Sequence, residues 1–389
     1  MFLPLPALAM LAGLAVYLHI RYPTALPWTS AGYIVQNAAQ AHARLDRQVV
    51  GFLPYWRLDD SRYIRHDLLS EVVFFALAAD ENGQIDKQDP GWRWWTSSVV
   101  RNQVAHSQID GDSFALAIAM QKQQQIQDFL RSNQAQQTLI ANMLDQVSAN
   151  KLDSLNLDFE VDGKVGDDER QAFTAFATAL TGAFHQQAPG KELSIDLPPL
   201  AARQSGLYDV AALAPLFDRV VVMSYDYYAS SSDVAGPIAP MSGFDQGQYF
   251  FDVSTTYADF ARLVPKDKLV MGVPYYGYDW PVQDDSKPLA PTLPQNDANG
   301  YPEILSYSRM KTDSDLKDCR WDDTAQETWC GYTDPKTNIQ REVWLEDQRS
   351  IAVKYDFARS QALGGVAIWT LGYDGAYPEL WDLLRAKFT

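Results

Sequence analysis

The sequence predicts an α/β fold, namely a closed (β/α)8 barrel with a small subdomain inserted between strands 7 and 8. Eight apolar runs rich in β-forming residues occur between residues 49 and 372, and longer segments with helical patterns separate them. Such alternation predicts a parallel sheet, and eight units are typical of a closed barrel. A doubly wound open sheet is the main alternative, but no Gly-rich phosphate-binding turn follows the first run.

The expected strands are short apolar runs that end in turn residues. They cover residues 49–56, 71–79, 114–120, 152–160, 193–199, 219–226, 268–277 and 364–372. Helices are expected between them, among others at 123–150 and 168–185. The second of these has apolar residues at the spacing of one helix face, at Phe173, Phe176, Leu180 and Phe184.

The connection between the seventh and eighth expected strands is too long to be a structureless loop. Residues 278–342 are rich in Asp, Pro, Asn, Thr and Tyr, and we interpret them as an inserted subdomain that walls a cleft. They contain both cysteines of the chain, Cys319 and Cys330, eleven positions apart. A lone close pair favours a loop-stapling disulfide in an oxidising compartment over two idle thiols.

The first 18 residues carry no charged side chain and are marginally long enough to span a membrane. We interpret 1–20 as a signal peptide or a membrane anchor, 21–47 as a tether and lead-in, and 48–389 as the barrel domain. No Lys or Arg precedes the apolar run, and Arg21 behind it favours a cytoplasmic C-terminal side. The cysteine pair still favours export, to the cell envelope as an anchored, periplasmic or secreted protein.

The charge balance argues against one class of partner. Lys and Arg number 32 and Asp and Glu number 49, and the net charge of −17 opposes binding to the phosphates of nucleic acid. The five histidines are scattered, at positions 19, 42, 66, 106 and 185, and no CxxC or HExxH pattern occurs. We expect no metal, no cofactor, a monomer, and membrane contact only through the N-terminal segment.

The fourth expected strand places polar groups in an otherwise apolar run. Asn156, Asp158 and Glu160 alternate with apolar residues, so they share one face of a strand at steps of roughly 6.6 Å. One interpretation is an edge strand with one face in water. The other is a catalytic strand, because reactive groups of a barrel collect at the C-terminal ends of its strands.

The other strand ends favour the catalytic interpretation. Six of them carry aromatic residues, with a few acids among them. A single aromatic residue at such a position is more often a packing residue, but six together indicate a cleft that stacks sugar rings. Two carboxylates in such a cleft indicate cleavage of a glycosidic bond.

The positions of Asp158 and Glu160 constrain the mechanism. Both leave one strand, so they would lie on the same side of a substrate, whereas the usual retaining pair flanks the sugar. A 2-acetamido group on the sugar would solve this problem, because its carbonyl oxygen can act as the nucleophile while Glu160 protonates the leaving oxygen. Asp158 would orient the acetamido N–H, and the neighbouring like charges would keep one carboxyl protonated near neutral pH.

Three motifs resemble those of glycoside hydrolase family 18, the chitinase-like family. Asp153-x-x-Asn156-x-Asp158-x-Glu160 resembles its DxxDxDxE signature on the fourth barrel strand. Met223-Ser224-Tyr225-Asp226 is similar to its sixth-strand Met-Thr-Tyr-Asp motif, and residues 364–369 are similar to its last strand. The resemblance covers roughly residues 49–372.

The resemblance implies a role for each matched residue. Glu160 would be the general acid/base, Asp158 the acid that orients the acetamido group, and Tyr225 a hydrogen-bond donor to the acetamido carbonyl. Asp153 would be structural. The substrate-binding residues would be Asp226, Trp369, Tyr55, Phe75, Met223 and Asn156. Asn156 departs from the signature, because a neutral amide replaces the middle acid and removes one partner that could share the proton of Asp158.

The implied activity is that of a retaining glycosidase on β-linked N-acetylhexosamine glycans. Residues 342–351, followed by Lys354, look most like the branch with chitobiase-like and spore-cortex or peptidoglycan-directed members, so chitin-like and wall glycans are comparable candidates. A catalytically silent, lectin-like barrel at the cell envelope is the alternative, although such members usually lack the acid at position 160. An envelope-anchored scaffold is a third possibility, suggested by the N-terminal segment.

Overall fold

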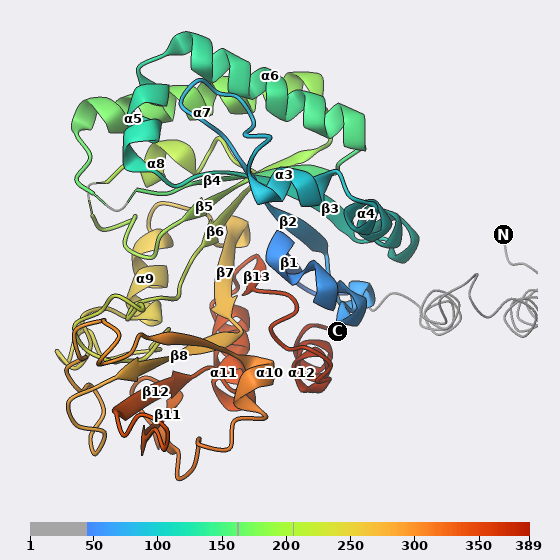
Figure 1. Cartoon of the computed structure of the whole chain (residues 1–389). Helices are drawn as coiled ribbons and strands as arrows, with labels where there is room; N and C mark the ends of the chain where they lie inside the picture. The colour runs from blue at the N-terminus through green and yellow to red at the C-terminus, as the bar shows by residue number, and fades with distance from the viewer. Residues whose placement is uncertain (1–44, 162, 205) are drawn as a thin grey trace, which may run out of the picture.

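The computed structural model describes residues 45–161, 163–204 and 206–389, which form a closed barrel with a smaller sheet beside it (Figure 1). The predicted segment 1–20 and most of the predicted tether 21–47 lie outside the described residues. Within the described ranges, no helix has the length and apolar character needed to cross a membrane.

Eight parallel strands close the barrel, so the (β/α)8 prediction is confirmed. Their order around the barrel is β1-β13-β7-β6-β5-β4-β3-β2. Several strands end earlier than the sequence predicts, because the residues that follow them leave the ladder and form the mouth of the barrel. The strands are β1 (Gln48–Pro54), β2 (Glu71–Ala78), β3 (Ser113–Met120), β4 (Ser154–Phe159), β5 (Glu192–Leu197), β6 (Arg219–Val222), β7 (Leu269–Pro274) and β13 (Gly365–Trp369).

Strand β4, which carries Asn156 and Asp158, pairs with β3 on one side and β5 on the other. All six of its residues are buried, so the interpretation as a half-wet edge strand is wrong. Leu155, Leu157 and Phe159 pack into the main core between the barrel and its helices. The intervening polar residues therefore point into the barrel, as the twofold alternation of a strand requires.

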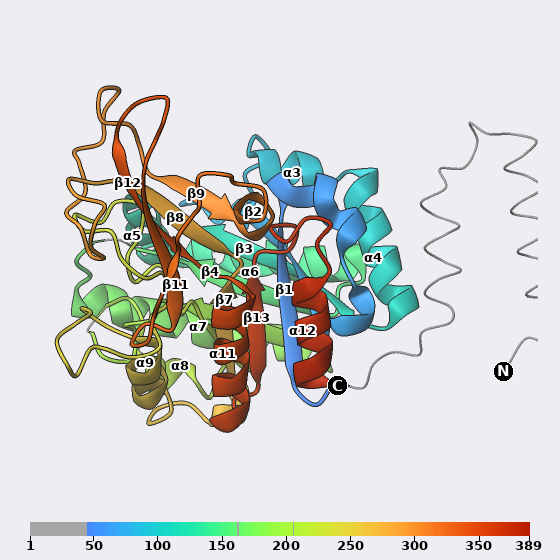
Figure 2. The ribbon, with the colours of Figure 1, turned by 90° about the horizontal axis from the view of Figure 1, so that it is seen from below.

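Helices cover the outside of the barrel (Figures 1 and 2). The predicted helix 123–150 is two helices, because Ser132 begins a new one: its side chain accepts a hydrogen bond from the Ala135 N–H and caps α6. The α-helices are α3 (Pro90–Trp95), α4 (Ser98–Asp110), α5 (Gln123–Leu130), α6 (Asn133–Asn150), α7 (Asp167–Gln187), α8 (Val210–Leu213), α9 (Val253–Phe260), α10 (Tyr307–Met310), α11 (Gln348–Ser360) and α12 (Glu379–Phe388); the 3-10 helices are η1 (Tyr55–Tyr63), η2 (His66–Leu68) and η3 (Lys266–Lys268).

A buried ion pair fills the end of the barrel where the strands begin. The guanidinium of Arg219 on β6 meets the carboxylate of Glu71 on β2 through two contacts of 2.8 Å. The hydroxyl of Ser154 on β4 also donates to Glu71. The buried guanidinium compensates the charge of the buried carboxylate, and the pair occupies the end of the barrel opposite the mouth.

The inserted subdomain is a five-stranded antiparallel sheet of order β10-β11-β12-β8-β9. It begins at Tyr276 and ends at Leu345, where the sequence predicts an insertion over about 278–342. Cys319 and Cys330 form a disulfide, which joins the segment before β10 to β11. The strands are β8 (Tyr276–Pro281), β9 (Glu303–Ser306), β10 (Arg320–Asp322), β11 (Glu327–Thr333) and β12 (Gln340–Leu345).

Buried charges fix the inserted sheet against the barrel. Glu327 on β11 accepts the backbone N–H groups of Ile238 at 2.9 Å and Ala239 at 2.7 Å, in the loop between β6 and α9. The Lys354 ammonium on α11 lies 2.6 Å from Glu346 and 3.6 Å from Glu327. All three charged side chains are fully buried, so the sheet, the loop and the helix are held as one unit.

The described chain enters the barrel at its closed end. The N–H of Asp46, just before β1, donates to the carbonyl of Phe388 at the end of α12 at 2.9 Å. Residues 45–48 lie beside residues that precede β2, β7 and β13. The first described residues are therefore on the face opposite the mouth, and Figure 2 shows the start of β1 close to the C-terminus.

Candidate active site

The mouth of the barrel contains a pocket of about 310 Å³. It is formed where strands β1 to β6 and β13 end, as expected for a barrel enzyme. Five acids line it, and no Lys, Arg or His does. The lining residues are Phe52, Tyr55, Trp56, Phe75, Ala76, Ala78, Asp89, Ala119, Gln121, Asp158, Glu160, Asp196, Val221, Met223, Tyr225, Asp226 and Trp369.

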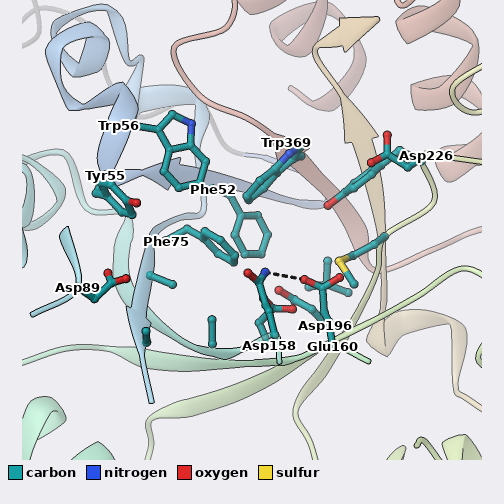
Figure 3. A pocket seen from close by; sticks show the side chains of 17 residues that line it. Phe52, Tyr55, Trp56, Phe75, Asp89, Asp158, Glu160, Asp196, Asp226 and Trp369 are labelled. Atoms are coloured by element: carbon teal, nitrogen blue, oxygen red, sulfur yellow. Dashed lines mark hydrogen bonds between the residues drawn. The ribbon is translucent and has the colours of Figure 1, made fainter. Parts of the chain in front are cut away.

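Asp158 and Glu160 enter the pocket from the end of β4 (Figure 3). The side chain of Gln121, just after β3, donates to Oε1 of Glu160 at 2.8 Å and so fixes one carboxylate oxygen. Asp158 lies deeper and is only 1% exposed. Neither of its carboxylate oxygens has a hydrogen-bond partner among the described residues, so both are available to a ligand or a shared proton.

Asp196 on β5 is a second buried carboxyl beside Asp158, and it is 3% exposed. Its Oδ1 accepts a hydrogen bond from Nδ2 of Asn156 at 2.7 Å, and Asn156 also donates to the Ser194 hydroxyl at 3.0 Å. Asn156 pairs with Ser194 in the β4–β5 register, so the residues two positions further on, Asp158 and Asp196, are also neighbours.

Burial and neighbouring negative charges raise the pKa values of Asp158 and Asp196 above those of ordinary carboxyl groups. Burial, followed by the charges of Glu160 and Asp196, raises the pKa of Asp158 well above its usual value, and the nearby amide of Gln121 opposes the rise. Burial raises the pKa of Asp196 to about 8. The pKa of Tyr225 is also raised, chiefly by burial, so its hydroxyl remains a donor at neutral pH.

Aromatic rings form the opposite wall of the pocket (Figure 3). The indole of Trp369, at the end of β13, packs edge-to-face with Phe75 at 4.8 Å and with Phe52 at 6.0 Å. Tyr55 and Trp56 extend this wall toward the solvent, and the Trp56 side chain is 48% exposed. Flat apolar faces next to carboxylates can stack on a sugar ring while the acids bind its hydroxyls.

Asp226 follows β6 and is held by the inserted sheet. Its carboxylate accepts the hydroxyl of Tyr276 at 2.5 Å and that of Tyr278 at 3.3 Å, both on β8. The Asp226 backbone has a φ of +57°, a left-handed conformation that costs energy for a residue other than glycine and often marks a functional site. Burial of the carboxyl raises the pKa of Asp226 to about 6.

Most of the predicted site residues lie together, but Asn156 does not line the pocket. It is fully buried beneath Asp158, because it is two residues further back along β4, and it contacts Asp196 instead of the cavity. Asp153 lies outside the pocket before β4, where it accepts the Phe114 N–H and pairs with Lys191. The predicted residues that line the pocket are Glu160, Asp158, Tyr225, Asp226, Trp369, Tyr55, Phe75 and Met223.

The other lining residues were not predicted as site residues from the sequence; those with aromatic or polar side chains are Phe52, Trp56, Asp89, Gln121 and Asp196. Asp196 had a visible signal, because Ser194 and Asp196 alternate with apolar residues just as Asn156 and Asp158 do. Asp89 caps α3 by accepting the Gly91 N–H at 2.7 Å, and nothing in its local sequence separates this role from one in the pocket. Within the described ranges, no group of three or more His, Cys, Asp or Glu side chains is arranged to hold a metal ion.

The family model for glycosyl hydrolases family 18 matches residues 48–374. The chain belongs to glycosyl hydrolase family 18. This family 18 chain is 28% identical over 272 residues to rat (Rattus norvegicus) di-N-acetylchitobiase, covering 64% of this chain and 71% of the relative. It is 30% identical over 230 residues to the cortical fragment-lytic enzyme of Bacillus subtilis strain 168, covering 57% of this chain and 47% of that enzyme.

Solved structures of family 18 members share the fold. The group IV chitinase of Ostrinia furnacalis in complex with allosamidin superposes with a TM-score of 0.73 at 19% identity, covering 88% of this chain and 98% of the chitinase. The family match, together with the curated relatives, confirms that this family 18 protein is a glycosidase.

Proposed function

We propose that the protein is a retaining glycosidase that hydrolyses β-linked N-acetylhexosamine glycans, with the 2-acetamido group of the substrate as the nucleophile. The observation that carries the proposal is the position of Asp158 and Glu160, which reach the pocket from one end of one strand. Two acids on the same side of a sugar cannot attack and protonate it from opposite faces, so the nucleophile has to come from the substrate.

In the proposed reaction, Glu160 donates its proton to the glycosidic oxygen as the bond to C1 breaks. The acetamido carbonyl oxygen attacks C1 and closes an oxazolinium ring. Water then opens the ring while Glu160 accepts a proton, so the configuration at C1 is retained after two inversions. Asp158 accepts the acetamido N–H, and the Tyr225 hydroxyl donates to the acetamido oxygen, which holds the group in position to attack.

Asp226 is the other carboxylate that could be considered as an enzymatic nucleophile. Two tyrosine hydroxyls donate to it, and such bonds lower the nucleophilicity of a carboxylate. We assign it to binding sugar hydroxyls, and we assign the aromatic wall of Trp369, Phe75 and Tyr55 to stacking on the sugar.

The relatives support an N-acetylated glycan as the substrate class. Two of them are named di-N-acetylchitobiase and cortical fragment-lytic enzyme. A pocket lined by aromatic rings and acids suits a neutral, hydroxyl-rich sugar. We propose chitin-like and peptidoglycan-derived oligosaccharides as the substrates to compare first, by digestion and mass spectrometry of the products.

The test of the mechanism combines one substitution with one change of substrate. Wild type should cleave N-acetylated chitooligosaccharides, and Glu160→Gln should lose about 10²-fold or more of kcat, within the usual contribution of general acid–base catalysis. A fully deacetylated oligosaccharide should bind without being cleaved. Equal rates for wild type and Glu160→Gln would overturn the role of Glu160, and efficient cleavage of the deacetylated glycan would overturn the acetamido nucleophile.

The lectin-like alternative makes the opposite prediction, namely binding of the same oligosaccharides with no turnover by wild type. The presence of Glu160 in the pocket, in contact with Gln121, argues against it. We further propose that the protein is exported to the cell envelope. The Cys319–Cys330 disulfide supports this location, because such bonds persist in oxidising compartments.

A further inference from the structure

Asp158 and Asp196 form a buried pair of acids, and no Lys, Arg or His among the described residues lines the pocket that they enter. They occupy neighbouring positions on β4 and β5, their side chains enter the same pocket, and both are nearly inaccessible to solvent. Two neighbouring ionised carboxylates that are buried from solvent repel each other strongly, and the usual result is that the pair keeps one proton.

The charged groups around the pair do not relieve this repulsion. Glu160 faces it from beyond the end of β4 and adds a third acid, and Tyr225 faces it from beyond the end of β6 as a neutral hydroxyl. The cation whose charge acts on Asp196 is Arg219 on β6, which lies toward the closed end of the barrel and is already paired with Glu71 of β2. The proton itself is therefore the counter-charge available to the pair.

The two acids have different partners. Asp196 is fixed, because Asn156 donates to its Oδ1, and this bond leaves Oδ2 for a second hydrogen bond. Asp158 has no hydrogen-bond partner for either oxygen among the described residues. The neutral amide at position 156 therefore positions the acid on β5 without adding a further charge, and Asp158 is the member of the pair that is free to meet a ligand.

We propose that Asp196 is the proton-holding partner of Asp158 during catalysis, and that Asn156 positions it. This inference rests on the proposed function of the pocket. In the free protein the pair shares one proton. When the acetamido N–H of the substrate reaches Asp158, the O–H bond on Asp158 breaks and an O–H bond forms on Asp196 Oδ2, so Asp158 accepts from the substrate as an anion and the number of protons is unchanged.

A direct test is infrared titration of the full chain without substrate. Wild type should show the C=O band of a protonated carboxyl at pH 7, and the band should disappear on ionisation near pH 8. Asp196→Asn should remove this band, because the carboxyl that ionises near pH 8 is gone. Asp158→Asn should move its titration to lower pH, because one neighbouring negative charge is gone while burial remains. Asp374→Asn is the matched control, since Asp374 is a buried acid outside the pocket with a pKa raised by burial to about 7.

A kinetic test uses a dinitrophenyl β-chitobioside, whose leaving group departs without protonation, so that Glu160 does not limit the rate. For wild type and Asp374→Asn, kcat/KM should fall above about pH 8, where Asp196 ionises and repels Asp158. Asp196→Asn keeps an N–H donor but cannot ionise, so this alkaline fall should be absent. Asp196→Ala lacks the donor and should have a kcat at least tenfold lower at every pH. The exchange Asn156→Asp with Asp196→Asn should bring the alkaline fall back.

The proposal is overturned if wild type shows no protonated carboxyl near neutral pH, if its band survives Asp196→Asn, or if Asp196→Asn keeps the alkaline fall. If a variant does not fold, the infrared titration of wild type alone can still overturn the proposal. If wild type cleaves no N-acetylated glycoside at all, the proposed function fails, while the infrared titration still tests the shared proton separately.

Discussion

Gln121 contributes to the pocket through a hydrogen bond to Oε1 of Glu160, at 2.8 Å. The bond restrains a carboxyl group at the rim of the pocket, where water would otherwise compete for it. Loss of the correct orientation of a catalytic group lowers the reaction rate strongly, because small displacements remove the geometry that proton transfer needs.

We therefore expect Gln121→Ala to lower kcat by about tenfold, with a smaller change in KM. The measurement is steady-state kinetics on an N-acetylated chitooligosaccharide. Gln124→Ala is a matched control, because Gln124 lies on the nearby helix α5 and its amide donates hydrogen bonds to Asp128 on the same helix. A kcat of Gln121→Ala equal to that of the control would show that Gln121 does not orient Glu160 for catalysis.

The residue scale also shows where sequence reasoning succeeds and fails. Asp158, Glu160, Tyr225 and Trp369 were predictable, because each lies at or just beyond the C-terminal end of a strand and barrel topology brings these ends together. Asn156 was predictable as a polar residue on the correct face, but not its depth, since the alternation on a strand gives the face and not the distance from the mouth. Gln121 was not predictable, because a polar residue after a strand is common in any turn.

At the scale of elements, β8 connects the inserted sheet to the chemistry of the barrel. Its Tyr276 and Tyr278 both donate to Asp226, whose backbone is held in the left-handed region. The inserted sheet is thus more than a wall of the cleft, because it fixes the position of an acid that follows β6.

We expect Tyr276→Phe to lower kcat/KM by roughly 10- to 100-fold, since hydrogen bonds to charged groups contribute about 1.5–3 kcal/mol. Tyr278→Phe breaks the longer bond of 3.3 Å and should have a smaller effect. Loss of the Tyr276 donor should also shift the ionisation of Asp226 to higher pH, because that bond stabilises the charged form. Equal effects of both substitutions, or none, would contradict this role of β8.

The elements themselves were largely predictable from periodicity. The eight runs correspond to the eight barrel strands, and the helical spacing of Phe173, Phe176, Leu180 and Phe184 corresponds to the buried face of α7. The break between α5 and α6 was missed, because Ser132 can cap a helix or lie within one, and tertiary packing decides between them. The pairing order in the inserted sheet could not be predicted from the sequence either, since its strands are short and separated by long connections.

At the scale of the whole molecule, several buried carboxyl groups have pKa values above their usual range. Burial is the largest cause in each case, and the values are about 6 for Asp226, about 7 for Glu342 and Asp374, and about 8 for Asp196. The folded protein therefore keeps protons that the unfolded chain releases above about pH 4. Their stabilising contribution is complete below the unfolded pKa and is lost as the pH rises through the folded pKa.

We expect the urea midpoint of unfolding to fall as the pH rises from 5 to 8, and the growing negative charge of an acidic chain acts in the same direction. Glu342→Gln should make the fall less steep, because it removes one of the titrating groups while its buried position in the inserted sheet lies away from the pocket. A midpoint that rises between pH 5 and 8 would show that other groups dominate.

The entry of the chain at the closed end of the barrel has a consequence for orientation. Residue 45 and the pocket lie at opposite ends of β1. Any attachment made through the residues before residue 45 is therefore on the side of the barrel opposite the substrate pocket. If the exported protein is held at the cell envelope through those residues, its mouth faces away from the attachment point. A glycan chain then binds at the mouth without having to pass between the enzyme and the surface to which the enzyme is attached.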